Sequence, residues 1–257
     1  KEKIMAIKER TEVVVLPEMF STGFTMSAST QADSMDGETI AWMKEVSAEK
    51  KIILTGSVII EEKGEYFNRL IWMLPNGQHG VYDKRHLFAY AGEDRQYTAG
   101  SKRLIASVKG WKINLLVCYD LRFPVWARQH TSPLTPLQGR GEQTPTSDGT
   151  GVNELEYDVL IYVANWPERR INAWKTLLQA RAIENQCYVV GVNRIGDDGY
   201  NIHYTGESMV VDPMGEVLYQ KKDVEDAFTI TLDKEHLQSI RDKFPFWKDA
   251  DQFVIND

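Results

Sequence analysis

Three polar residues with complementary chemistry each stand directly after a short apolar run: Glu18, Lys84 and Cys118. The carboxylate of Glu18 can accept the thiol proton, and the resulting thiolate can attack a carbonyl or nitrile carbon. The ammonium group of Lys84 can stabilise the oxyanion that forms. Because ligand sites gather at the carboxyl ends of strands in layered α/β sheets, we expect the three side chains to meet in one site.

The cysteine is the centre of this hypothesis. The apolar residues 113–117 predict a strand that leads into Cys118, and the chain then turns through Tyr119 and Asp120 into a helix predicted to begin near Arg122. The N–H groups and dipole of a helix N-terminus favour a thiolate and would lower the pKa of Cys118. The alternative is a buried, unreactive cysteine, which is the common state of a lone cysteine in a globular enzyme.

Each of the other two residues has a simpler explanation when taken singly. Glu18 could cap a turn, and Lys84 could belong to an exposed basic cluster with Arg85 and His86. A papain-like hydrolase would instead need a histidine base, and His86 is the only one of the 5 histidines beside a motif. No local cysteine-protease signature accompanies Cys118.

The elements that must position these residues follow from hydrophobic periodicity and turn signals. Helices are predicted at residues 38–51, 172–186 and 234–241, with a helix tail at 1–10. Strands are predicted at residues 12–16, 52–60 with a break at Gly56, 66–74, 79–82, 104–108, 111–117, 157–164, 187–192, 204–211, 216–220 and 227–232. Many strands with interspersed helices indicate an α/β or α+β sandwich.

Residues 130–154 interrupt this alternation. They are rich in Pro, Gly, Thr and Ser and have no hydrophobic period. Because strands and helices resume unchanged afterwards, we interpret the segment as a low-complexity surface insertion within a single domain over residues 1–257, with a functional lid as the alternative.

Composition excludes several classes of partner. The 257 residues are 42% hydrophobic and 26% charged, and the formal net charge of -7 argues against nucleic acid or an anionic membrane. No apolar run approaches the roughly 18 to 20 residues of a membrane helix. The 2 cysteines make no disulfide framework, which indicates a reducing, cytoplasmic setting. Paired-cysteine, H-E-x-x-H, Walker and dinucleotide motifs are missing, so we expect no metal and no cofactor.

Three motifs resemble those of the nitrilase superfamily, the carbon–nitrogen hydrolases. They are the segments LPEMF at 16–20, YDKRHLF at 82–88 and VCYDLRFP at 117–124, and they occur in the family's order. The similarity extends over nearly the whole chain, including residues 164–167 and 179–186. The motifs and the aromatic tail that ends at 247–251 are similar to the bacterial omega-amidase branch.

The resemblance implies an αββα four-layer sandwich that usually pairs into a homodimer. It also implies roles for individual residues. Cys118 would be the nucleophile, and Glu18 would be the general base and then the acid. Lys84 and the backbone N–H of Tyr119 would hold the oxyanion, and Glu93 would be an assisting glutamate.

The resemblance implies small amide substrates of the 2-oxoglutaramate and 2-oxosuccinamate type, whose carboxylate needs a cationic pocket. Arg122 is a candidate for that contact, with an internal salt bridge as the alternative. Trp166 is a candidate pocket wall, with a core position as the alternative. Nitrilases and N-carbamoyl amidohydrolases use the same catalytic residues, and a non-catalytic relative is a further alternative.

The chain departs from the family pattern at two places. Only residues 1–11 precede the strand predicted at 12–16, whereas the family usually begins with a strand and a helix before the glutamate motif. We therefore expect the first strand to be missing, as in an N-terminal truncation. The insertion at 130–154 is also unlike the family.

Overall fold

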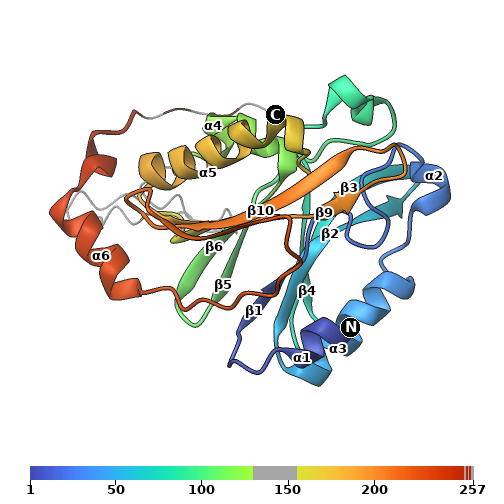
Figure 1. Cartoon of the computed structure of the whole chain (residues 1–257), viewed down its shortest axis with the longest axis horizontal. Coiled ribbons are helices and arrows are strands. Elements are labelled where there is room, and N and C mark those ends of the chain that lie inside the picture. Colours follow the sequence, from blue (N-terminus) through green and yellow to red (C-terminus); the bar gives the residue numbers. More distant parts are fainter. Residues whose placement is uncertain (130–154, 252, 254, 256–257) are drawn as a thin grey trace, which may run out of the picture.

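Two β-sheets pack face to face, and helices cover the outer face of each (Figure 1). The computed structural model describes residues 1–129, 155–251, 253 and 255, so the predicted insertion at 130–154 lies outside the described residues. The order of layers is helix, sheet, sheet, helix. The four-layer αββα sandwich expected from the sequence is therefore confirmed.

The first sheet has the strand order β1-β2-β3-β4, with β1 parallel to β2 and the other pairs antiparallel. Its strands are β1 (Val13–Val15), β2 (Ile53–Glu62), β3 (Glu65–Met73) and β4 (His79–Asp83). Beside them lie the helices α1 (Glu2–Ala6), α2 (Ala28–Gln31) and α3 (Glu38–Lys50). Apolar side chains of α3, among them Ile40, Met43 and Val46, form a buried cluster with Leu54 of β2. This contact holds the helix layer on the sheet because it removes apolar surface from water.

The second sheet has the order β11-β10-β8-β7-β6-β5, with β9 paired to β10 beside this path. Its strands are β5 (Leu104–Val108), β6 (Trp111–Val117), β7 (Val159–Ala164), β8 (Tyr188–Asn193), β9 (Ile195–Asp197), β10 (His203–Val211) and β11 (Val217–Lys222). Its helices are α4 (Pro124–Ala127), α5 (Ile171–Asn185) and α6 (Lys234–Lys243). The central strands β6, β7 and β8 are parallel, and every residue of β7 is buried. A continuous apolar run is what a parallel strand covered on both faces requires.

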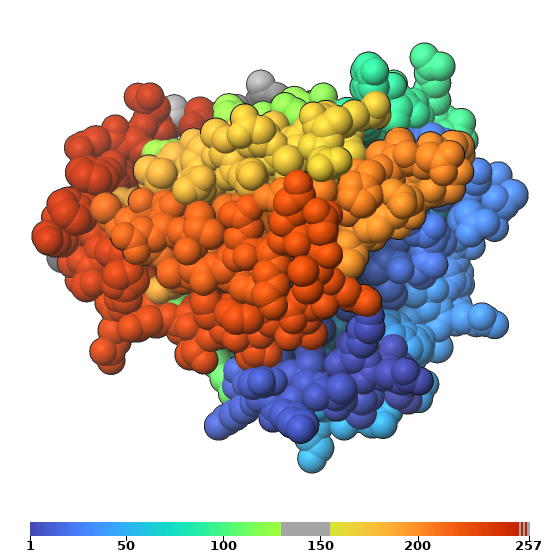
Figure 2. All heavy atoms as spheres, viewed as in Figure 1, coloured from blue at the N-terminus to red at the C-terminus, as the bar shows by residue number. Residues whose placement is uncertain are grey.

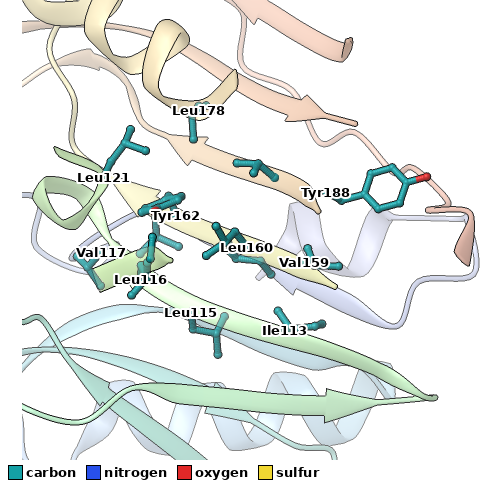
Figure 3. Close-up of a cluster of buried hydrophobic side chains, with 14 of the residues drawn as sticks. Ile113, Leu115, Leu116, Val117, Leu121, Val159, Leu160, Tyr162, Leu178 and Tyr188 are labelled. Atoms are coloured by element: carbon teal, nitrogen blue, oxygen red, sulfur yellow. The ribbon is translucent and has the colours of Figure 1, made fainter. Parts of the chain in front are cut away.

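The largest apolar cluster joins both sheets and the helix layer above the second sheet. Figure 3 shows Leu178 of α5 on one side of this sheet and Leu115 of β6 on the other. Leu115 belongs to the same cluster as Leu70 and Trp72 of the first sheet. The strand ends that carry the candidate residues are therefore held by a core that spans three layers.

The N-terminal residues lie beside the segment that follows β11, as the space-filling view in Figure 2 shows. Lys3 forms an ion pair with Glu225 across this contact. In the described part of the chain β1 has β2 as its partner and forms the edge of the first sheet.

Several predicted elements differ from the observed ones. Gly56 does not break β2, because the missing side chain admits a neighbouring segment instead: a Cβ there would lie 2.8 Å from Leu16 Cβ and 2.9 Å from Phe20 Cδ1. The strand predicted at 227–232 is wrong, since Phe228 stacks on Tyr219 of β11 with 4.0 Å between ring centroids and joins no sheet. The short strand β9 lies between β8 and β10, where the sequence predicts no strand.

The helix predicted from Arg122 onward is also shorter than expected. The 3₁₀ turn η3 (Cys118–Arg122) ends before Pro124, and α4 then continues only to Ala127. Proline disfavours the helical conformation of the preceding residue, and Phe123 has φ -114° and ψ 88°. The proline therefore separates the turn at Cys118 from the helix.

A glycine sets the distance between α5 and the second sheet. A Cβ at Gly191 of β8 would lie 2.5 Å from Leu178 Cδ1 and 2.8 Å from Trp174 Cζ2, and both of these side chains are fully buried. We expect Gly191→Ala to lower the free energy of unfolding by about 1–3 kcal/mol, as overpacking of a core does. Urea denaturation measures this change. Gly199→Ala is the control because a Cβ there has no neighbour within 4 Å; equal stability of the two variants would contradict the packing argument.

Candidate active site

Glu18 is a buried carboxylate fixed by groups from three separate segments. It follows β1, and its Oε1 accepts hydrogen bonds from Asn68 Nδ2 at 2.8 Å and from Lys84 Nζ at 2.9 Å. Its Oε2 accepts the backbone N–H of Asn165 at 2.8 Å, while Asn165 Nδ2 donates to the Glu18 carbonyl at 2.7 Å. The carboxylate is thus oriented from both sides by donors.

Lys84 lies between two carboxylates in the interior. Its Nζ is 2.9 Å from Glu18 Oε1, and 3.0 and 2.9 Å from the two carboxylate oxygens of Glu93. All three side chains are buried. Burial opposes the lysine charge, but the charges of Glu18 and Glu93 outweigh it and hold the pKa of Lys84 well above its usual value.

Glu93 is the third member of this cluster, which we call the Glu–Lys–Glu triad (Glu18, Lys84 and Glu93). It belongs to the 3₁₀ turn η2 (Glu93–Arg95), and its Oε2 accepts the Phe88 N–H at 2.5 Å. Burial and repulsion from Glu18 raise its pKa, although Lys84 acts in the opposite direction. The assisting glutamate expected in the loop after the lysine therefore lies in contact with that lysine.

Cys118 occupies a sharp turn between β6 and η3. Its φ of +45° is in the left-handed region, which costs a residue other than glycine of the order of 1–3 kcal/mol and is found where the surroundings impose it. Asp120 imposes it here: its buried carboxylate accepts the Val117 N–H at 3.0 Å and the Tyr82 hydroxyl at 2.7 Å. The turn is thereby tied to β4.

The same aspartate also fixes the segment after Lys84. Asp120 Oδ1 accepts the backbone N–H of His86 at 3.0 Å and lies 2.8 Å from His86 Nδ1. The His86 ring stacks on Phe123 with 3.8 Å between centroids. The histidine that a papain-like mechanism would require therefore faces Asp120 and is not among the residues that line the cavity beside Cys118.

The expectation that a helix N-terminus lowers the pKa of Cys118 is wrong. Burial and the negative charge of Glu18 raise this pKa well above its usual value, and Lys84 only partly opposes them. The helix expected to follow is divided into the five-residue turn η3 and the four-residue helix α4, so the dipole at the sulfur is weak. The resting state of Cys118 is a thiol beside a carboxylate.

A cavity of about 120 Å³ opens beside the cysteine. It brings together five of the residues proposed from the sequence: Lys84, Cys118, Tyr119, Arg122 and Trp166. The Tyr119 N–H belongs to the first turn of η3, where backbone donors have no partner within the helix. Lys84 and Tyr119 both line the cavity with Cys118.

Arg122 and Trp166 form one wall. The Arg122 guanidinium lies 5.0 Å from the centre of the Trp166 ring, and Arg122 has no ion pair with a carboxylate in the described part of the chain. Trp166 is both wall and core, since its ring is buried and lies 5.6 Å from that of Trp174.

Sequence reasoning missed several residues of this site. Asn68 and Asn165 orient Glu18, Asp120 ties down the turn, and Arg169 and Arg170 line the cavity. A polar residue inside an apolar strand was the available signal for Asn68. The arginines follow Pro167 in an ordinary polar stretch and gave no signal of their own.

Two classes of site or element do not occur in the structure as described. Residues 1–129 and 155–251 contain no group of three or more His, Cys, Asp or Glu side chains placed to hold a metal ion. No helix within the same ranges has the length and apolar character needed to cross a membrane.

Comparison with known proteins is consistent with this geometry. The carbon–nitrogen hydrolase family model matches residues 2–242. Omega-amidase YafV of Yersinia enterocolitica is 40% identical over 248 residues, which are 96% of this chain and 87% of that protein. The 2-oxoglutaramate amidase of Bacillus subtilis is 31% identical over 244 residues, 94% of this chain and 85% of the relative.

A solved structure of this family is also similar to the chain. The CN-hydrolase superfamily protein of Xanthomonas campestris, which carries an arsenic adduct in its active site, superposes with a TM-score of 0.90 at 40% identity. The alignment covers 99% of this chain and 90% of that one. The chain therefore belongs to the carbon–nitrogen hydrolase family, the nitrilase superfamily that its three motifs resemble, and is a hydrolase of carbon–nitrogen bonds.

Proposed function

We propose that this hydrolase is an omega-amidase, which releases ammonia from the terminal amide of a short ω-amido acid through a thioester on Cys118. The observation that carries the proposal is the buried Glu–Lys–Glu triad beside a cysteine that opens into a small cavity. A base, an oxyanion donor and a nucleophile are what amide hydrolysis by covalent catalysis requires.

Acylation begins with proton transfer from the Cys118 thiol to Glu18. The thiol needs this base because its pKa is raised. The sulfur then attacks the amide carbon, and Lys84 and the Tyr119 N–H stabilise the oxyanion. Glu18 returns its proton to the amide nitrogen, the carbon–nitrogen bond breaks, and ammonia leaves a thioester.

Deacylation uses Glu18, Lys84 and the Tyr119 N–H again, with water in place of the thiol. Glu18 takes a proton from water, which attacks the thioester carbon, and the oxyanion again lies at Lys84 and Tyr119. The carbon–sulfur bond breaks and the proton returns to the sulfur, which regenerates the thiol. Glu93 keeps Lys84 in place, because it holds the ammonium at 2.9–3.0 Å throughout.

The cavity supports a short, anionic substrate. Its volume of about 120 Å³ is well below the roughly 300–1,000 Å³ of pockets for drug-sized ligands. Arg122 at its wall supplies a cation for a carboxylate, and Trp166 supplies an apolar surface for the carbon chain. 2-Oxoglutaramate, which is the substrate in the name of the Bacillus relative, fits these features. The shorter 2-oxosuccinamate fits them as well.

Removal of the thiol tests the proposal directly. We expect Cys118→Ala to reduce ammonia release from 2-oxoglutaramate by roughly 10⁴-fold or more, as loss of a nucleophile does, with an unchanged circular dichroism spectrum. Cys187→Ala is the control, since Cys187 is a buried thiol in the core. Near-normal turnover by Cys118→Ala would refute the mechanism. Parallel assays with a short nitrile and an N-carbamoyl amino acid identify the alternatives, and no release from any substrate would indicate a non-catalytic relative.

The base role of Glu18 has its own test. In Glu18→Gln no group remains to take the thiol proton, so we expect acylation itself to stop and the first turnover to yield no ammonia. A rapid-quench measurement of ammonia against enzyme concentration detects such a burst. Glu61→Gln, an exposed position on β2, is the control that keeps the burst. A burst of full size from Glu18→Gln would show that another group activates the thiol.

The proposal extends to a homodimer formed through the helix layer of the second sheet. Apolar side chains are exposed there: Val125 of α4 is 54% exposed and Ile183 of α5 is 54% exposed. We expect the wild-type chain to sediment as a dimer and Val125→Glu with Ile183→Glu to sediment as a monomer, because charges oppose burial of that face. Tyr200→Glu, on an exposed loop, is the control. A monomeric wild-type chain would contradict the dimer.

A further inference from the structure

We propose that Arg170 is the specificity-determining residue of the cavity, and that its guanidinium binds the carboxylate of a substrate with no ammonium group beside it. The inference rests on the proposed amidase function and adds the residue that selects the substrate. Arg170 ends the 3₁₀ turn η4 (Glu168–Arg170) and lines the cavity together with Cys118.

The position of Arg170 is fixed by residues of the site. Its carbonyl accepts the indole N–H of Trp166 at 2.8 Å, and its guanidinium lies 5.0 Å from the centre of the Phe88 ring. Phe88 in turn donates its backbone N–H to Glu93. Stacking on an aromatic face leaves the guanidinium N–H groups free in the plane of the fork, where they match a carboxylate.

The charge of Arg170 has no counter-ion within the described residues. Its side chain is half-buried, yet it forms no ion pair or hydrogen bond there. Four other arginines withdrawn from solvent pair with carboxylates, namely Arg69, Arg103, Arg181 and Arg241. The half-buried Arg128 and Arg194 donate to backbone carbonyls, a contact that the Arg170 side chain lacks within the described residues. A partly desolvated cation without a partner is a binding site for an anion, because the ligand restores the missing interaction.

Two neighbouring arginines strengthen this preference. Arg122 and Arg169 line the same cavity and are more exposed than Arg170. Burial, with repulsion from Arg169 and Arg122 added to it, lowers the pKa of Arg170. An anion at the centre of the three guanidinium groups relieves this repulsion.

The cavity brings the arginines and the candidate nucleophile together. Cys118, Lys84 of the Glu–Lys–Glu triad and the three arginines all line it. An ω-amido acid enters with its neutral amide towards Cys118 and its carboxylate towards Arg170. An α-amino acid amide such as glutamine would bring an ammonium group close to these guanidinium groups, and like charges repel. The arginines thus favour a 2-oxo acid over the matching amino acid.

Substrate competition tests the inference in the active enzyme. We expect Arg170→Gln to lower the ratio of kcat/KM for 2-oxoglutaramate to that for butanamide, an uncharged amide, by about 10- to 100-fold, the value of one charge-assisted hydrogen bond. We expect this lower ratio to come from a higher KM for 2-oxoglutaramate. The ratio of kcat/KM for 2-oxoglutaramate to that for glutamine falls as well. Arg170→Lys, which keeps the charge, recovers part of the ratio. Arg10→Gln, at an exposed residue outside the site, leaves the ratio unchanged.

A binding measurement separates this inference from the proposed function. Calorimetry on Cys118→Ala measures the affinity for 2-oxoglutarate, and we expect Arg170→Gln in that background to weaken it by about 10- to 100-fold. The role of Arg170 would be overturned if Cys118→Ala bound 2-oxoglutarate equally well with and without Arg170→Gln. It would also be overturned if Cys118→Ala did not bind 2-oxoglutarate at all. An inactive wild-type chain whose Cys118→Ala variant binds the dicarboxylate through Arg170 would refute the amidase and support the arginine site.

Discussion

The structure depends on one buried ammonium group shared by two carboxylates. Lys84 would be expensive to bury alone, and Glu18 and Glu93 would repel each other without it. With the ammonium 2.9–3.0 Å from both, the three charges can be held in the interior. The triad joins three segments: the end of β1, the end of β4 and the turn η2. It is therefore both a structural clamp and the charge environment of the cysteine.

The surroundings of Cys118 also determine its protonation state. Burial raises the pKa of the thiol and the negative charge of Glu18 adds to this effect, so the thiol holds its proton. A thiolate stabilised by a helix would be reactive towards any electrophile. In the proposed mechanism the thiol is instead activated by Glu18 once an amide is bound. The short turn η3 and the proline after it suit this second arrangement, because they leave almost no helix dipole at the sulfur.

The cavity beside Cys118 is also lined by charged residues. Lys84 and three arginines line it, and no Asp or Glu side chain does so in the described part of the chain. A lining of this charge attracts an anion, which is the feature that the proposed carboxylate substrate would use. The network around Asp120 holds the Cys118 turn and the Lys84 segment together, since it ties that turn to Tyr82 of β4 and to the backbone of His86.

The sequence by itself determined the class of fold and singled out the residues of the proposed catalytic set. Glu18, Lys84 and Cys118 follow apolar runs, and strand periodicity is a local property that can be read from neighbouring residues. Tertiary structure decided the rest. The proline at 124 shortened the expected helix, and the strand predicted at 227–232 found no partner, because ladder formation depends on distant segments. The pKa of Cys118 depends on burial and on charges far apart in the chain, and so does the lack of a counter-ion for Arg170 among the residues that the structure describes. No local pattern contains either property.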